Sequence, residues 1–134
     1  MKILTLIPLA ALACACTASD IDEPTRLGAA EPSELGRRLA GYSERETVSC
    51  VPLRQLRDSR AYGTDTVVFE GSPGTLYVNR LRSECPRVEP GYAIRHRATG
   101  TTMCSGEPIT VFDATSRVEY GGCALGEFTR YQRD

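Results

Sequence analysis

The hydrophobic and polar positions of this chain change their pattern near Val48. Beyond it, Val, Ile, Thr, Tyr and Phe gather in short runs that Gly and Pro separate. Short runs of this composition, bounded by turn residues, are typical of β-strands. The pattern therefore predicts a mainly β domain over residues 48–131.

Three pairs of these runs have the spacing of β-hairpins. A Gly-Ser-Pro-Gly loop connects the first pair, residues 98–100 connect the second, and residues 113–116 connect the third. Three consecutive hairpins predict a small antiparallel meander of about five to seven strands, and closing the sheet into a barrel would remove its exposed edges. The paired runs are 66–70 with 75–80, 92–97 with 101–104, and 109–112 with 117–120.

Residues 53–62 fit two patterns. Leu53 and Leu56 lie at helical spacing, whereas the end of the segment reads like a strand. Periodicity alone does not separate these alternatives in so short a segment. We therefore leave this segment open between a helical turn and a strand.

Residues 17–47 contain few β-branched and aromatic side chains and are rich in Ala, Glu, Pro, Gly and Arg. Such a composition buries too little apolar surface to fold alone, so it predicts a flexible tether. Within the tether, Ser33 is placed to cap a short helix. Leu35 and Leu39 would share one face of that helix, and Gly41 would end it.

Residues 1–16 carry the pattern of an export signal. Lys2 supplies a positive charge at the N-terminus. The apolar run 3–12 is too short to span a bilayer, which takes about 20 residues. Small residues then precede Cys14, which is similar to a bacterial lipoprotein signal, where the cysteine is lipidated and becomes the mature N-terminus. Cys14 is the predicted lipidation site and Cys16 the alternative, and cleavage without lipidation is the remaining interpretation.

The resemblance to lipoprotein signals also implies a destination. Neither Ala15 nor Thr17, the residues that follow the two candidate cysteines, is the Asp of an inner-membrane retention signal. We therefore expect an outer-membrane lipoprotein that faces the periplasm and is held in the membrane by its N-terminal lipid. Without that lipid, the protein would be soluble in the periplasm.

Four further cysteines point to the same compartment. They are even in number and lie within the predicted domain, so we expect two disulfides, which form where conditions are oxidising. No two of them have the close C-x(2–4)-C spacing that zinc sites favour. Four cysteines allow three pairings, and the sequence does not choose among them; a closed barrel would favour Cys50 with Cys123 and Cys85 with Cys104.

Four blocks of sequence, each with one of these cysteines, carry a family resemblance. They are CVPLRQLRDSR from Cys50, LYVNRL with Cys85-Pro86 after it, MCSGEPI from Met103, and CALGEF from Cys123. The blocks resemble a family of small exported proteins from sphingomonad-type and other proteobacteria that carry a domain of unknown function. The resemblance covers about residues 48–130 and implies an exported domain, but it implies no activity and no site residue.

The chain lacks the usual combinations of catalytic residues. His96 is the only histidine, and it lies between two arginines in a predicted strand, where a half-packed structural side chain is the usual role. No G-x-S-x-G motif supplies a nucleophile for it, and no Gly-rich phosphate loop follows a strand and opens a helix. We therefore predict no catalytic residue, cofactor site or metal ligand, no cofactor, and no nucleic-acid partner.

Arginine placement gives the one candidate surface. Side chains two residues apart on a strand share a face, so two arginines of each of two strands would point the same way. If these strands were neighbours, their guanidinium groups could capture carboxylate or phosphate groups, with tyrosines nearby for stacking; the alternative is an ordinary solvated face. The candidate anion-binding surface consists of Arg80, Arg82, Arg95, Arg97, Tyr77 and Tyr92.

These observations lead to two functional hypotheses. The first is a non-enzymatic cell-envelope protein with a binding or protective role, directed at an anionic envelope component or a partner protein, or acting as an inhibitor of an envelope-acting enzyme. The alternative is a small envelope hydrolase that acts on peptidoglycan or glycan. A cleft lined by converging carboxylates would favour the hydrolase, and a shallow Arg and Tyr surface would favour binding.

Lipidation at Cys14 is open to a direct test. Mass spectrometry of the mature protein should find a diacylglyceryl group on an N-terminal Cys14. Cys14→Ser should move the protein to the soluble fraction because the anchor is lost, whereas Cys16→Ser should leave it in the membrane. An unmodified N-terminus at Cys16 or Ser19 would contradict the prediction.

Overall fold

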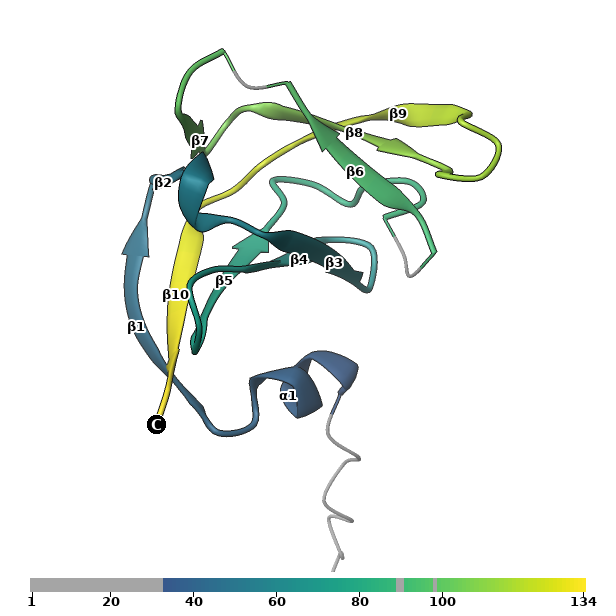
Figure 1. The fold of residues 1–134 in the computed structure, drawn as a ribbon. Coiled ribbons are helices and arrows are strands. Elements are labelled where there is room, and N and C mark those ends of the chain that lie inside the picture. The colour runs from purple at the N-terminus through teal and green to yellow at the C-terminus, as the bar shows by residue number, and fades with distance from the viewer. Residues whose placement is uncertain (1–32, 89–90, 98) are drawn as a thin grey trace, which may run out of the picture. The chain divides into compact units, whose positions relative to one another are not determined.

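The computed structural model describes residues 33–88, 91–97 and 99–134 (Figure 1). The predicted signal peptide, both candidate lipidation sites and residues 17–32 of the predicted tether lie outside the described residues. No helix in the described ranges is long and apolar enough to span a membrane.

Antiparallel sheets dominate the described residues, which confirms the mainly β prediction. Over these described ranges, ten strands form three sheets and two short segments are helical. Each of the three sheets is open, so the barrel interpretation and the count of about five to seven strands are wrong. The largest sheet has the order β1 (Tyr42–Val48), β10 (Phe128–Arg133), β5 (Thr75–Arg80), β4 (Thr66–Glu70) and β3 (Asp58–Tyr62). The smaller sheets are β2 (Cys50–Pro52) with β7 (Thr102–Cys104), and β6 (Ala93–His96) with β8 (Pro108–Phe112) and β9 (Glu119–Ala124).

Two of the three predicted hairpins form. Strands β4 and β5 pair from Thr66 opposite Arg80 to Glu70 opposite Leu76, and β8 pairs with β9. The second hairpin is wrong, because β6 pairs with β8 and β7 pairs with β2. The short connection between β6 and β7 suggested a hairpin, but the apolar face of β6 matches that of β8.

Both helical segments follow their sequence signals. Helix α1 (Glu34–Leu39) begins with the Ser33 hydroxyl accepting the Gly36 N–H at 3.0 Å, as expected for an N-cap. The ambiguous segment 53–62 contains both alternatives in turn, since the 3₁₀ helix η1 (Leu53–Gln55) is followed by β3.

The folded region begins upstream of the expected boundary at Val48. Apart from Val48, strand β1 lies within the predicted tether, and it pairs with β10, with Tyr42 opposite Arg133. The sequence pattern did not predict this strand, because its middle residues are charged and exposed. A bulge between Glu44 and Thr47 also interrupts the pairing. Charges and bulges are common on edge strands, where they oppose pairing with other chains.

Both faces of the five-stranded sheet are covered (Figure 1). Val67 and Phe69 of β4 face a core that reaches the two smaller sheets, whereas Val68 faces a second cluster beneath Leu35 and Leu39 of α1. Since side chains alternate between faces, a strand buried on both sides reads as a continuous apolar run. The run Val-Val-Phe in β4 is such a case.

The structure confirms two disulfides and corrects their pairing. Cys50 pairs with Cys104, which is its direct neighbour across β2 and β7, and Cys85 pairs with Cys123 of β9. The expected pairing assumed a closed barrel, which does not form, so Cys50 and Cys123 belong to different sheets. Two disulfides identify an extracytoplasmic protein.

A buried asparagine holds the segment that leads into β10. Asn79 is fully buried; its Nδ2 donates to the Gly126 carbonyl at 2.8 Å, and its Oδ1 accepts the Gly126 N–H at 2.9 Å. A Cβ on Gly126 would lie 1.8 Å from the Arg80 carbonyl oxygen. The Asn79 amide thus pairs with both backbone polar groups of Gly126. The close approach of the two chain segments leaves room there for glycine alone.

Asn79→Ala should lower the free energy of unfolding by about 3 kcal/mol, because two buried backbone groups lose their partners. Gly126→Ala should destabilise the protein at least as much. Urea unfolding with the disulfides intact measures both effects. The matched control is Gly100→Ala, where the added Cβ meets nothing within 4 Å and the change should stay within about 0.5 kcal/mol.

Candidate functional site

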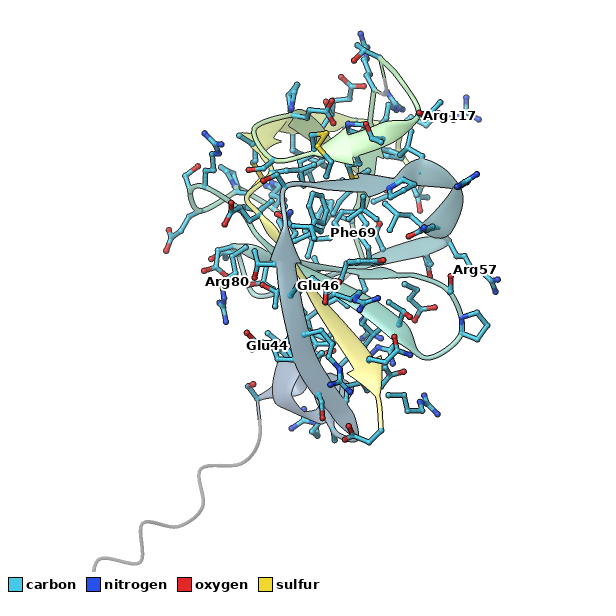
Figure 2. All side chains as sticks on the ribbon, turned by 90° about the vertical axis from the view of Figure 1, so that its left-hand side faces the viewer. Glu44, Glu46, Arg57, Phe69, Arg80 and Arg117 are labelled. Carbon is cyan, nitrogen blue, oxygen red and sulfur yellow. A yellow bond between two sulfur atoms is a disulfide. The ribbon has the colours of Figure 1, made fainter. Side chains whose placement is uncertain are left out.

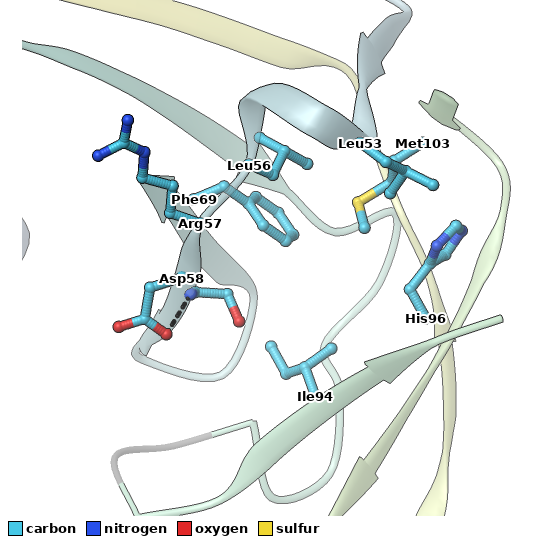
Figure 3. A pocket seen from close by; sticks show the side chains of 9 residues that line it. Leu53, Leu56, Arg57, Asp58, Phe69, Ile94, His96 and Met103 are labelled. Atoms are coloured by element: carbon cyan, nitrogen blue, oxygen red, sulfur yellow. Dashed lines mark hydrogen bonds between the residues drawn. The ribbon is translucent and has the colours of Figure 1, made fainter. Parts of the chain in front are cut away.

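A pocket of about 250 Å³ opens between β3 and β6 (Figure 3). Each of these strands is the edge of its own sheet. Most of the lining is apolar, and three of the four polar lining residues are Arg57 and the first two residues of β3. The lining consists of Leu53, Leu56, Phe69, Ile94 and Met103 together with Arg57, Asp58, Ser59 and His96.

The turn η1 presents two leucines to this pocket. The Leu56 N–H donates to the Leu53 carbonyl at 3.0 Å, which closes the turn, and the Leu53 N–H donates to the Thr101 carbonyl at 2.9 Å. Residues three apart on a helical turn lie on one side of it, so Leu53 and Leu56 both reach the pocket. The helical spacing seen in the sequence therefore shapes one wall of the site.

His96 forms part of another wall and is held by Glu107. Its Nε2 lies 2.8 Å from Glu107 Oε2, and its side chain is 7% exposed. The same carboxylate oxygen accepts the Cys104 backbone N–H at 2.8 Å, which holds the pKa of Glu107 below its ordinary value; His96 adds to this effect, while burial opposes it. The pair links β6 to the turn between β7 and β8.

The rim of the pocket carries two neighbouring side chains of opposite charge, Arg57 and Asp58. The Arg57 side chain is exposed, and its guanidinium forms no ion pair within the described residues. The neighbouring Asp58 carboxylate instead accepts the Ser59 backbone N–H at 2.8 Å (Figure 3). Figure 2 shows Arg57 at the surface, away from the buried Phe69 ring.

The structure does not assemble the arginine surface expected from the sequence. Arg80 ends β5 of the five-stranded sheet, and Arg95 lies on β6 of the three-stranded sheet, so their strands are not neighbours. Arg95 forms an ion pair with Glu119, and Arg82, which follows β5, donates to Ser105 Oγ at 3.4 Å. The condition under which these arginines would form one patch is therefore not met.

The two tyrosines assigned to that surface have other partners. Tyr77 is buried and its hydroxyl donates to Gln55 Oε1 at 3.2 Å. The Tyr92 hydroxyl accepts from Arg87 at 3.0 Å, and its ring packs edge-on against Tyr120. Neither ring is presented with Arg80 and Arg95 as one stacking platform.

Sequence reasoning named His96 but missed Arg57, Ser59 and Glu107 as parts of one site. His96 lies in the strand expected for it, but its pairing with Glu107 depends on the turn after β7, which no sequence signal placed beside β6. Within the described ranges, no cluster of three or more His, Cys, Asp or Glu side chains is arranged to hold a metal ion.

Comparison of the chain with models of protein families, with curated proteins and with solved structures finds no match. The resemblance carried by the four cysteine blocks therefore stays a prediction.

Glu107→Gln should destabilise the protein most at neutral pH. Because the folded state lowers the pKa of Glu107 below 4.5, ionised Glu107 stabilises the fold above about pH 4.5, and this contribution is lost as the pH falls through the folded-state pKa. We expect a loss of about 1–2 kcal/mol at pH 7 that shrinks on acidification. Urea unfolding at several pH values measures it.

The matched control is Glu127→Gln, since Glu127 is exposed and makes no hydrogen bond or ion pair within the described residues. A Glu107→Gln effect as large at pH 3 as at pH 7 would show that the charge of Glu107 is not what stabilises the fold.

Proposed function

We propose that this protein is a non-enzymatic cell-envelope protein that binds an anionic ligand or partner. The pocket between β3 and β6 would hold an apolar group, and Arg57 would meet the negative charge beside it. The observation that carries the proposal is the combination of five apolar lining side chains with a guanidinium that forms no ion pair within the described residues.

The size and lining of the pocket support binding of one small apolar group. Pockets for drug-sized ligands hold about 300–1,000 Å³, so a pocket of about 250 Å³ suits a side chain or a short acyl segment. Burying each CH₂ group there would contribute about 0.8 kcal/mol. An apolar anchor of a few carbons would therefore supply most of the affinity.

Arginine gives the site its preference for anions. Arg57 lines the pocket, and Arg54 lines a second, larger pocket on the other side of Leu53. Neither guanidinium forms an ion pair within the described part of the chain. A planar guanidinium can bind a carboxylate or phosphate through two parallel hydrogen bonds, so these residues favour an acidic group at the pocket mouth.

The proposed location combines the disulfides with the N-terminal sequence. The disulfides are those of an extracytoplasmic protein. The lipoprotein-like pattern of residues 1–16 supports anchoring in the outer membrane. An anchored binding domain would meet anionic envelope components, partner proteins of the envelope or envelope-acting enzymes.

One observation bears on the hydrolase alternative. His96 lies at the pocket wall and is oriented by Glu107, as a catalytic base would be. A base also needs a nucleophile within hydrogen-bond reach. Among the described residues, no hydrogen bond joins His96 to Ser59, the one hydroxyl of the lining. We therefore favour binding over hydrolysis.

Binding can be tested with 8-anilino-1-naphthalenesulfonate, a dye that joins an apolar ring system to a sulfonate. The purified protein should enhance its fluorescence saturably under native conditions. Leu56→Gln, which keeps the side-chain size but removes the apolar surface, should weaken binding about tenfold, and Arg57→Gln should weaken it about threefold.

Val118→Thr is the matched control, because Val118 is a 48% exposed apolar side chain outside the pocket. It should leave dye binding unchanged. Equal weakening by Val118→Thr and Leu56→Gln, or no saturable binding at all, would refute the proposed function.

A further inference from the structure

The pocket lies between two sheet edges that face each other without pairing. Among the strands that the structure describes, β3 pairs with β4 alone and β6 with β8 alone. The pocket lining includes Ser59 of β3 and Ile94 of β6 (Figure 3). The outer side of an edge strand presents backbone N–H and C=O groups that can pair with another extended chain. A partner segment placed here would reach both the strand edge and the apolar pocket.

At the start of β3, a backbone N–H donates to a neighbouring side chain and not to another strand. The Ser59 N–H donates to the carboxylate of Asp58 at 2.8 Å, whereas the Arg57 N–H donates across to Glu70 of β4 at 2.9 Å. The Asp58 carboxylate therefore occupies one backbone donor of an edge strand (Figure 3). Rotation of the Asp58 side chain would release that donor.

The arginines near the pocket indicate the chemistry of the partner segment. Arg54 directly follows Leu53, and Arg57 directly follows Leu56. Neither arginine has an ion-pair partner within the described residues. By contrast, Arg60 and Arg38 beyond the pocket are already paired with Glu34 and Glu70. Arg54 and Arg57 thus place two guanidinium groups beside the pocket, where Asp58 supplies one carboxylate, and this excess of positive charge complements an acidic segment.

We propose that this groove binds an extended acidic peptide segment of a partner protein by strand addition to β3. The segment pairs with the Ser59 N–H, inserts one apolar side chain into the pocket, and places a carboxylate against Arg57. Strand addition obtains affinity from main-chain hydrogen bonds and specificity from pockets for alternate side chains. This inference rests on the proposed function and names the class of its partner.

A labelled peptide, acetyl-Glu-Leu-Thr-Leu-Glu-amide, tests the inference by fluorescence polarisation with the purified protein. It should bind and displace the sulfonate dye. The same peptide with N-methylated backbone amides should bind at least about tenfold more weakly, because its amides cannot donate to the outer carbonyl groups of β3 and the methyl groups obstruct close strand pairing.

Three variants separate the parts of the proposal. Arg57→Gln should weaken peptide binding about fivefold, and Asp58→Ala should strengthen it, since the Ser59 N–H no longer has a competing acceptor. Arg45→Gln removes an equal charge from β1, the opposite edge of the five-stranded sheet, and should leave the affinity unchanged.

The outcomes distinguish the inference from the proposed function. If the dye binds but the peptide does not, or if the N-methylated peptide binds equally well, the pocket takes a small amphiphile and strand addition is wrong. Equal weakening by Arg57→Gln and Arg45→Gln would also overturn it, because general charge attraction would explain both. If neither dye nor peptide binds, the proposed function itself fails.

Discussion

Burial of both faces of the five-stranded sheet is the constraint on which the rest of this structure depends. Strands β4 and β5 are apolar on both sides, so each face must be covered. Leu35 and Leu39 of α1 cover one face, and the two smaller sheets share the core on the other. A chain of this size has little apolar surface to spare, which explains why a six-residue helix with no buried residue of its own is retained.

One disulfide fastens the second layer to the first, and the other lies within the two-stranded sheet. Cys85 follows β5 and Cys123 lies on β9, so their bond ties the three-stranded sheet to the segment that leaves the five-stranded one. Cys50 and Cys104 join β2 to β7, and the Cys104 N–H donates to the carboxylate that holds His96. The wall of the pocket is therefore coupled to a covalent bond, although none of its lining residues is a cysteine.

Local features were predictable from the sequence and distant pairings were not. The β4–β5 turn and the Ser33 cap depend on residues close in the chain, and both form as expected. The leucine spacing of η1 is also local, and it correctly marked one of the two alternatives left open for that segment. The pairing of β1 with β10 joins residues eighty or more positions apart. Strand β6 pairs with β8 and not with β7, the next strand along the chain. A spacing of a few residues between β6 and β7 resembled a hairpin because sequence distance carries no information on which faces match.

The candidate site depends on contacts between segments that are distant in the sequence. Its lining comes from η1, β3, β4, β6 and β7, so no single segment carries its pattern. The arginine surface expected from period-two spacing failed for the same reason, since that argument needed two strands to be neighbours and they belong to different sheets. The pocket exists because two sheets that share one core need not pair at their edges. Strands β3 and β6 do not pair, and between them apolar side chains lie beside the backbone donors of a strand edge.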